Sequence, residues 1–96
     1  MILRTSLRAE RQIQVARHWW LQNRDKAPEA FDEELVRARN VILDAPHAGK
    51  PSRTRHGKLI RRLTLERIHY YLYYRVERDR VQLLSLWHTS RRPPRL

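Results

Sequence analysis

The chain has 96 residues, enough for a single domain over 1–96 with a modest core, and it has no cysteine, which excludes disulfide bonds and thiolate metal sites. Its formal net charge is +11, so we expect acidic partners such as nucleic acid or an acidic peptide. No stretch approaches the roughly 20 apolar residues of a membrane span, and the N-terminus lacks the apolar core of a signal peptide. We therefore expect a cytoplasmic protein.

The positive charge is concentrated in the second half of the chain. Residues 1–48 hold 8 Lys/Arg and 7 Asp/Glu, whereas residues 49–96 hold 13 Lys/Arg and only 3 Asp/Glu. Most of the basic residues are arginine, whose guanidinium binds carboxylate and phosphate in a bidentate manner. A GC-rich genome would favour Arg over Lys, but it would not produce the difference between the halves. We therefore predict that the second half binds the acidic partner.

The first half of the chain predicts an edge strand and a helix. Residues 2–5 have the character of a short extended segment, and Ser6 is a suitable N-cap for a helix from residue 7 to about residue 23. Apolar residues recur at helical spacing along that helix. Trp19 and Trp20 are adjacent, so one is expected in the core, and the other covers an edge or marks a contact surface.

A second helix follows a short break. Asp25 or a neighbour is expected to cap it, with Pro28 and Glu29 in its first turn. An apolar stripe at intervals of four and three residues continues to Ala45, and Pro46 ends the helix. The two helices therefore form a hairpin. Residues 46–58 contain two Pro and two Gly and predict a loop, which is either a solvated connector or a wall of an anion-binding groove.

Three short apolar runs over residues 59–65, 68–76 and 81–87 predict strands. The gaps between them are so short that the strands must be antiparallel neighbours. Alternation places Tyr70 and Tyr74 on the face that the helices cover, and Tyr71 and Tyr73 on the opposite face. The last run is apolar on both faces, as in a central strand. The fold class is thus α+β, in the order β-α-α-β-β-β, with a helical hairpin packed on an antiparallel sheet.

An ordered set of residues runs through the predicted elements: Pro46 and Gly49 after the second helix, Arg61-Arg-Leu63, Tyr70-x-x-x-Tyr74-Arg-Val76, and Val81-x-x-Leu84-x-x-Trp87-His-x-x-Arg91. With this set and this element order, the chain resembles the RelE/ParE superfamily, the toxins of bacterial type II toxin–antitoxin modules. The similarity covers nearly the whole chain. An apolar residue followed by His-x-x-Arg, here from Trp87 to Arg91, resembles the ending of ParE-like members, also called plasmid stabilisation proteins.

The resemblance implies an antitoxin partner and a target. Antitoxins of this superfamily have a disordered, acidic C-terminal segment that folds onto the toxin, which gives a hetero-oligomer and agrees with the charge asymmetry. ParE-like members poison DNA gyrase and are not known as nucleases, so the resemblance implies a gyrase inhibitor and not an enzyme. The residues expected to bind the antitoxin lie on the basic sheet: Arg61, Arg62, Tyr71, Tyr73, Arg75, Trp87, Arg91 and Arg92.

RelE-like members instead cut mRNA on the ribosome, and this alternative stays open. RNA cleavage needs a base, an acid and cations for the phosphate. His88 belongs to the residue type that most often serves as a general acid or base, and Arg61, Arg75 and Arg91 could hold phosphate. The chain lacks the C-terminal tyrosine that RelE-like nucleases use, although other branches use a Glu and a His. The alternative role of His88 is to cap or pack a strand end.

A third possibility is a basic nucleic-acid-binding module in which Tyr71 and Tyr73 stack on bases. The histidines have no metal-ligand spacing, and no motif for a cofactor or for a Ser-His-Asp site is present, so we expect neither metal nor cofactor. Residues 91–96 are basic, contain two prolines, and are expected to form a mobile tail.

Overall fold

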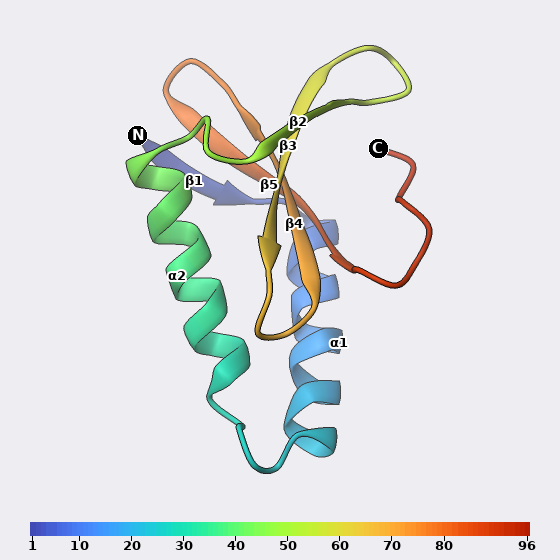
Figure 1. Ribbon diagram of the computed structural model, residues 1–96. Helices are drawn as coiled ribbons and strands as arrows, with labels where there is room; N and C mark the ends of the chain where they lie inside the picture. The colour runs from blue at the N-terminus through green and yellow to red at the C-terminus, as the bar shows by residue number, and fades with distance from the viewer.

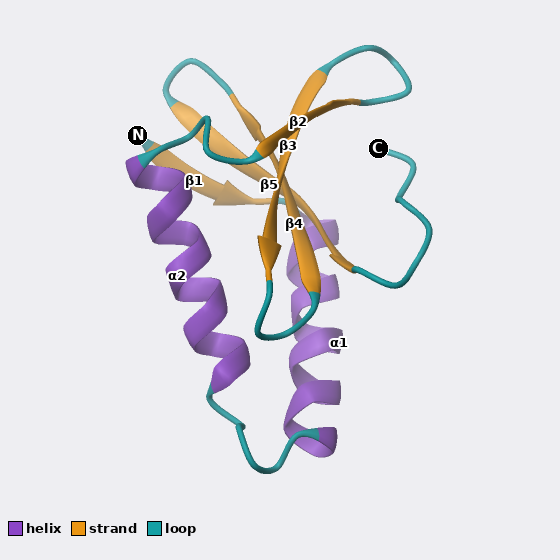
Figure 2. Ribbon diagram, in the orientation of Figure 1, coloured by secondary structure: helices purple, strands orange, loops and turns teal.

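A computed structural model describes all of residues 1–96. The elements are β1 (Ile2–Thr5), α1 (Leu7–Asn23), α2 (Ala30–Asp44), β2 (Lys50–Arg53), β3 (Leu59–Leu65), β4 (Tyr70–Val76) and β5 (Arg80–His88). The two helices run side by side as a hairpin and pack against the sheet (Figures 1 and 2). The predicted α+β class is confirmed. Neither helix has both the length and the apolar character that crossing a membrane requires.

The sheet has five strands in the order β1-β5-β4-β3-β2. β1 runs parallel to β5, which is possible because the helical hairpin lies between them in the chain, and the other neighbours are antiparallel. A β-bulge interrupts the β4–β5 ladder: Tyr73 pairs with Ser85 and Tyr74 with Leu83, so Leu84 has no opposite residue. The predicted three-stranded meander is confirmed, and β5 is an inner strand as its apolar character indicated.

The prediction that residues 46–58 form only a loop is wrong, because β2 lies within that range. All four of its side chains are exposed, so it has no alternation of buried and exposed positions that the sequence could reveal. The strand exists because it pairs with β3, where Lys50 lies opposite Arg62 and Pro51 opposite Arg61. Pro51 has no N–H to donate, and such a residue is tolerated on an edge strand.

α1 begins and ends where the sequence predicts. Ser6 is its N-cap, and the Ser6 hydroxyl accepts a hydrogen bond from the Ala9 N–H at 3.0 Å. Trp20 is 6% exposed and belongs to the core, whereas Trp19 is 46% exposed, so the expectation of one buried tryptophan is confirmed. The core also holds Phe31 of α2, whose ring lies edge-on to Tyr70 of β4.

The prediction that Asp25 or a neighbour caps α2, with Pro28 and Glu29 in its first turn, is wrong. α2 begins at Ala30, and Glu29 makes no side-chain capping bond. The Trp20 indole N–H donates to the Ala27 carbonyl at 2.8 Å, and the Ala30 N–H donates to the same carbonyl at 3.2 Å. These two bonds hold residues 27–30 as a turn, so α2 begins only at Ala30. Capping rules consider only the residues at the start of a helix and do not include a bond from the Trp20 side chain.

One buried hydroxyl fixes the segment after α2. The Tyr74 hydroxyl donates to the Pro46 carbonyl and accepts from the Gly49 N–H, both at 2.8 Å. Burial raises the pKa of Tyr74, while the bond from Gly49 and the charge of Arg61 oppose that rise. A Cβ at position 49 would lie 2.5 Å from the Tyr74 hydroxyl oxygen, so glycine is required there for close approach. The segment is thereby held against β4.

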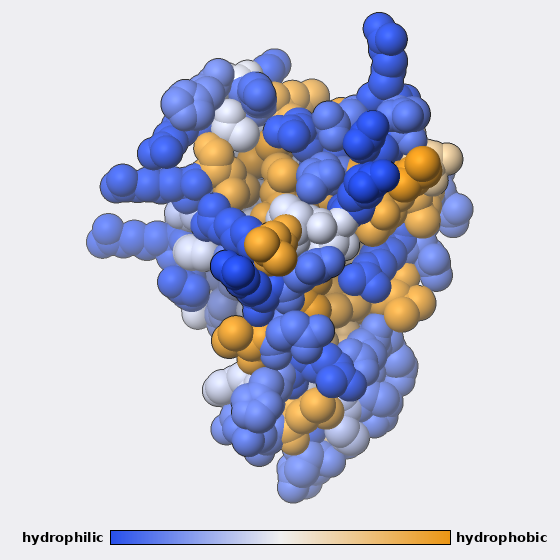
Figure 3. Space-filling view, turned by 180° about the vertical axis from the view of Figure 1, so that it is seen from behind, coloured by the Kyte–Doolittle hydropathy of each residue, from blue (hydrophilic) through white to orange (hydrophobic).

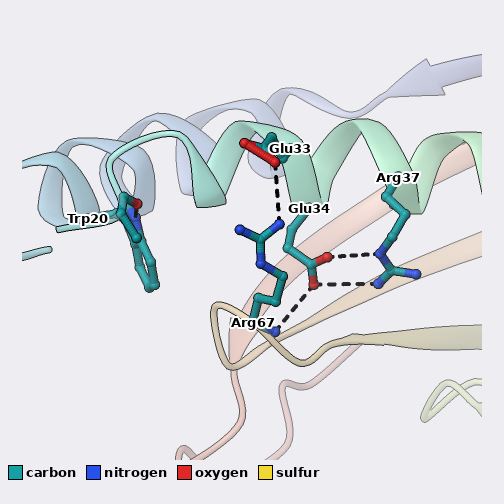
Figure 4. A network of polar contacts seen from close by, with 6 residues as sticks. Trp20, Glu33, Glu34, Arg37 and Arg67 are labelled. Carbon is teal, nitrogen blue, oxygen red and sulfur yellow. Dashed lines mark hydrogen bonds and ion pairs between the residues drawn. The ribbon is translucent and has the colours of Figure 1, made fainter.

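A buried carboxylate ties α2 to the turn between β3 and β4. Glu34 is 3% exposed, and its oxygens accept hydrogen bonds from the Arg37 guanidinium at 2.8 and 3.4 Å and from the Arg67 N–H at 3.3 Å (Figure 4). The hydrogen bond from Arg37 lowers the pKa of Glu34, against the opposing effect of burial. Arg67 also forms an exposed ion pair with Glu33 at 3.4 Å. A buried charge is tolerated here because it is fully hydrogen-bonded.

Candidate partner-binding surfaces

A groove of about 480 Å³ lies between α1 and the second half of β5. It forms because β1 ends at Thr5, whose partner on β5 is Leu83, so the rest of that edge of β5 has no neighbouring strand. Six of its ten lining residues are hydrophobic. The lining residues are Arg11, Gln12, Val15, Ala16, Trp19, Tyr70, Leu86, Trp87, His88 and Arg91.

Gln12 occupies the place where a further strand would pair with β5. Its side-chain oxygen accepts hydrogen bonds from the Leu86 N–H at 2.9 Å and from the Ser85 hydroxyl at 3.0 Å. Beside it, Val15 is 71% exposed and Trp19 is 46% exposed. The groove therefore combines a strand edge with exposed apolar side chains on α1, which is the composition of a surface that binds another polypeptide.

His88 and Arg91 lie at the end of the groove. Nδ1 of His88 accepts from the Ser90 N–H at 3.1 Å and lies 2.7 Å from the Ser90 hydroxyl, so the ring is held by the turn that follows β5. Tyr70 lies edge-on to this ring at 5.2 Å between centroids, and burial raises the pKa of Tyr70 while the charge of Arg91 opposes the rise. The Arg91 guanidinium stacks over Trp87 at 4.1 Å.

The other two residues considered for RNA cleavage lie elsewhere. The Arg61 guanidinium donates to the carbonyls of His47 and Gly49, at 3.1 and 3.0 Å. Arg75 pairs with Gln82, whereas His88 pairs with Tyr70 at the other end of the same ladder. Gln82 and His88 are six positions apart along β5, or about 20 Å. The structure therefore does not gather His88, Arg61, Arg75 and Arg91 around one phosphate.

No group of three or more His, Asp or Glu side chains is arranged to hold a metal ion. The geometry of the groove thus offers apolar contacts, a strand edge and two arginines. It offers no ligand set for a metal.

Comparison with known families decides the identity of the chain. A model of the family described as the ParE toxin of the type II toxin–antitoxin system, parDE, matches residues 3–93. The chain belongs to the ParE toxin family. A solved structure titled "Chromosomal ParDE TA system from P. aeruginosa" contains a similar chain with a TM-score of 0.75 and 22% identity, covering 94% of this chain and 97% of that one. At this identity the likeness concerns the fold. No curated protein matches the sequence.

In this ParE-family chain, Arg62, Tyr71, Tyr73 and Arg75 lie on the face of the sheet that the helices do not cover, which we call the open face. Arg62 stacks over the Tyr71 ring at 4.2 Å, and Tyr71 lies edge-on to Tyr73 at 6.2 Å. Tyr73 is only 5% exposed, so it offers little surface for stacking on a base. Arg92 is exposed, and its carbonyl accepts a hydrogen bond from the Trp87 indole N–H.

The end of the chain packs against the hairpin of β2 and β3. The Leu96 carbonyl accepts a hydrogen bond from the Arg55 N–H at 3.0 Å, and residues 93–96 line a hollow that they share with residues 52–55 and Ile60. Ile60 is 3% exposed although it lies on the open face. The predicted tail thus has defined contacts in this ParE-family fold.

Sequence reasoning missed Gln12 and Val15, which shape the groove. Val15 is apolar but lies outside the buried stripe of α1. That position was the signal in the sequence that could have indicated a second apolar surface on the helix. Nothing in the local sequence of this ParE-family chain shows that Gln12 meets β5, because Ser85 and Leu86 lie more than 70 residues away.

Proposed function

We propose that this chain inhibits DNA gyrase and is neutralised by an antitoxin with an acidic C-terminal segment. The observation that carries the proposal is the match to the ParE family over residues 3–93. ParE-like toxins act on gyrase, and the resemblance of the ending from Trp87 to Arg91 favours that branch. The chain acts by binding its target and not by catalysis, in the same compartment as gyrase, the cytoplasm.

The arrangement of the basic residues supports a binding role over RNA cleavage. Arg61 is engaged by two loop carbonyls, and Arg75 lies at the far end of the ladder from His88. His88 holds the turn at Ser90, in agreement with a structural role. A nuclease needs its base and its phosphate-binding cations within hydrogen-bond reach of one phosphodiester.

The groove beside α1 supports the antitoxin part of the proposal. A disordered segment loses entropy when it folds onto a partner, so it needs apolar anchors as well as charge pairs. Val15 and Trp19 provide exposed apolar surface, and Arg11 and Arg91 line the same groove without a carboxylate within ion-pair distance. An acidic segment with apolar anchors fits both features.

The first experiment is a pulse of expression in a gyrase-dependent bacterium with separate labelling of DNA and protein synthesis, followed by a supercoiling assay with purified gyrase. We expect DNA synthesis to stop first, with filamentation and an SOS response, and supercoiling to be inhibited. If protein synthesis stops first and mRNA is fragmented, the chain is a RelE-like nuclease and the proposal is wrong. If neither process changes, the gyrase proposal is also wrong.

The antitoxin site is tested with two matched variants. Val15→Glu places a negative charge in the groove, and Val36→Glu places the same charge on α2, where the valine is 55% exposed. The partner is a short acidic protein encoded beside this chain. We expect Val15→Glu to bind that protein more weakly and to remain toxic when the antitoxin is co-expressed. We expect Val36→Glu to bind the antitoxin and to be suppressed by it as the parent is. Equal capture by both variants would place the antitoxin outside the groove.

A further inference from the structure

Four basic side chains gather on the open face of the sheet. Lys50 lies directly opposite Arg62, and Arg62 lies opposite Tyr73. Arg4 and Arg75 both pair with Gln82, one from each side of β5. Residues that are directly opposite in a ladder point to the same face, and the next pair, Leu63 with Leu72, points toward the core. The cations therefore point away from the helices.

These four cations have no carboxylate partner. The ion pairs of the chain involve Arg17, Arg37, Arg67 and Arg80. Of these only Arg80, two residues before Gln82 on β5, lies on the open face, and it pairs with its neighbour Asp79 at 3.4 Å. Lys50 and Arg62 instead face each other across the β2–β3 ladder, and like charges directly opposite destabilise a sheet. A polyanion bound to this face would remove that repulsion.

The side chains around the four cations offer a ligand little accessible apolar surface, so positive charge is the main feature of the open face. Arg62 is held 4.2 Å over the Tyr71 ring, which limits its freedom and also covers the ring. Ile60 and Tyr73 on this face are only 3% and 5% exposed. Trp87 pairs with Tyr71 and so shares the face, and its ring is covered by the Arg91 guanidinium at 4.1 Å. The large apolar side chains of the open face in β3, β4 and β5 are thus either buried or covered by an arginine.

We propose that the open face binds the sugar–phosphate backbone of duplex DNA. A phosphate backbone needs cations and no apolar anchors, which is the composition of this face, whereas a folding peptide needs both. Contacts to phosphate position a protein on DNA without reading its sequence. The site gives the chain its own contact with DNA, and its existence does not depend on gyrase being the target.

The test is fluorescence anisotropy of the purified chain with a labelled 20-base-pair duplex over a range of salt concentrations. The double variant Arg62→Gln/Arg75→Gln removes two cations of the open face. We expect its affinity at 0.1 M salt to fall about tenfold or more, and the slope of log K against log salt to fall by about 2, because each phosphate contact contributes about 0.9. Thermal unfolding checks that the variant is folded.

The matched control is Arg8→Gln/Lys26→Gln, which removes the same charge from two exposed basic residues of the helical hairpin that form no ion pair. We expect its affinity and salt slope to stay close to those of the parent. An equal loss of affinity in both variants would mean that DNA is attracted by the charge of the whole surface. No loss of affinity in either variant would mean that the open face does not bind DNA and would favour an acidic protein as its ligand. Tighter binding of a matching RNA duplex would exclude DNA as the ligand. Each of these three results would overturn the proposal.

Discussion

The helix-facing side of the sheet and its open face differ in how their polar groups are paired. On the helix-facing side, the Tyr74 hydroxyl and the Glu34 carboxylate each have at least two hydrogen-bond partners. On the open face, Lys50 and Arg62 lie opposite each other with no carboxylate near. The comparison indicates that one side of the same strands is built for stability, whereas the other retains unpaired charge at a cost in stability.

Seen from behind, the surface of the molecule is largely hydrophilic, with hydrophobic patches between projecting hydrophilic side chains (Figure 3).

The largest effect is expected on the helix-facing side, from Tyr74→Phe. The change leaves the Gly49 N–H and the Pro46 carbonyl without their partner, so we expect the free energy of unfolding to fall by about 2 kcal/mol. Urea unfolding measures the change. The control is Tyr71→Phe, which removes a hydroxyl from the open face and should alter stability by less than about 0.5 kcal/mol. An equal fall in the free energy of unfolding for the two variants would contradict the conclusion that polar groups are better paired on the helix-facing side than on the open face.

A smaller effect is expected from Glu34→Gln. The amide keeps the shape but loses the charge-assisted bonds to Arg37, so we expect a loss of about 1 kcal/mol at pH 7. Glu33→Gln, which removes only an exposed ion pair, should change the free energy of unfolding much less.

The Glu34 contribution should also depend on pH. Because the folded protein lowers the pKa of Glu34, its carboxylate stabilises the fold above the unfolded pKa of about 4.3, and this stabilisation is lost as the pH falls through the lower, folded pKa. The difference between the parent and Glu34→Gln should therefore shrink in acid. A difference that stays constant down to pH 2 would show that the charge of Glu34 plays no part.

The smallest effect has the opposite sign. Lys50→Gln removes the like charge that faces Arg62, so we expect the free energy of unfolding to rise by about 0.3 kcal/mol at low salt. Salt screens exposed charges, and the gain should disappear near 0.5 M salt. Urea unfolding at two salt concentrations measures this. Lys26→Gln, in the loop between the helices, is the control of equal charge. A gain of the same size in Lys26→Gln would mean that net charge, and not the pair, is responsible.

The strong periodic patterns allowed most of the fold to be predicted. The stripe of Ala9, Ile13, Ala16 and Trp20 predicted α1, and the alternation from Tyr70 to Val76 predicted which side of β4 meets the helices. Each pattern arises because one face of the element is buried, and this burial repeats at a fixed spacing along a short stretch of sequence. β2 has no buried face, and so it left no pattern.

The candidate site was predicted in part. Trp87, His88 and Arg91 were singled out and do line the groove, whereas Arg61 and Arg75 lie apart from it. The opposite wall comes from Gln12, Val15 and Trp19, of which only Trp19 was considered as a contact residue. A groove between elements that lie 70 residues apart depends on how the sheet and helix pack, and no local pattern records that.

The amino-acid sequence by itself determined the type of every element except β2, the covered side of the sheet and the excess of arginine in the second half, since these follow from periodicity and composition. Only the tertiary structure decided where the charges stand. It placed Arg61 against loop carbonyls and Lys50 opposite Arg62, and it ended β1 early enough to leave a groove beside β5. The physical reason is that strand register and hydrogen-bond partners join residues far apart in the chain, where side-chain spacing carries no information.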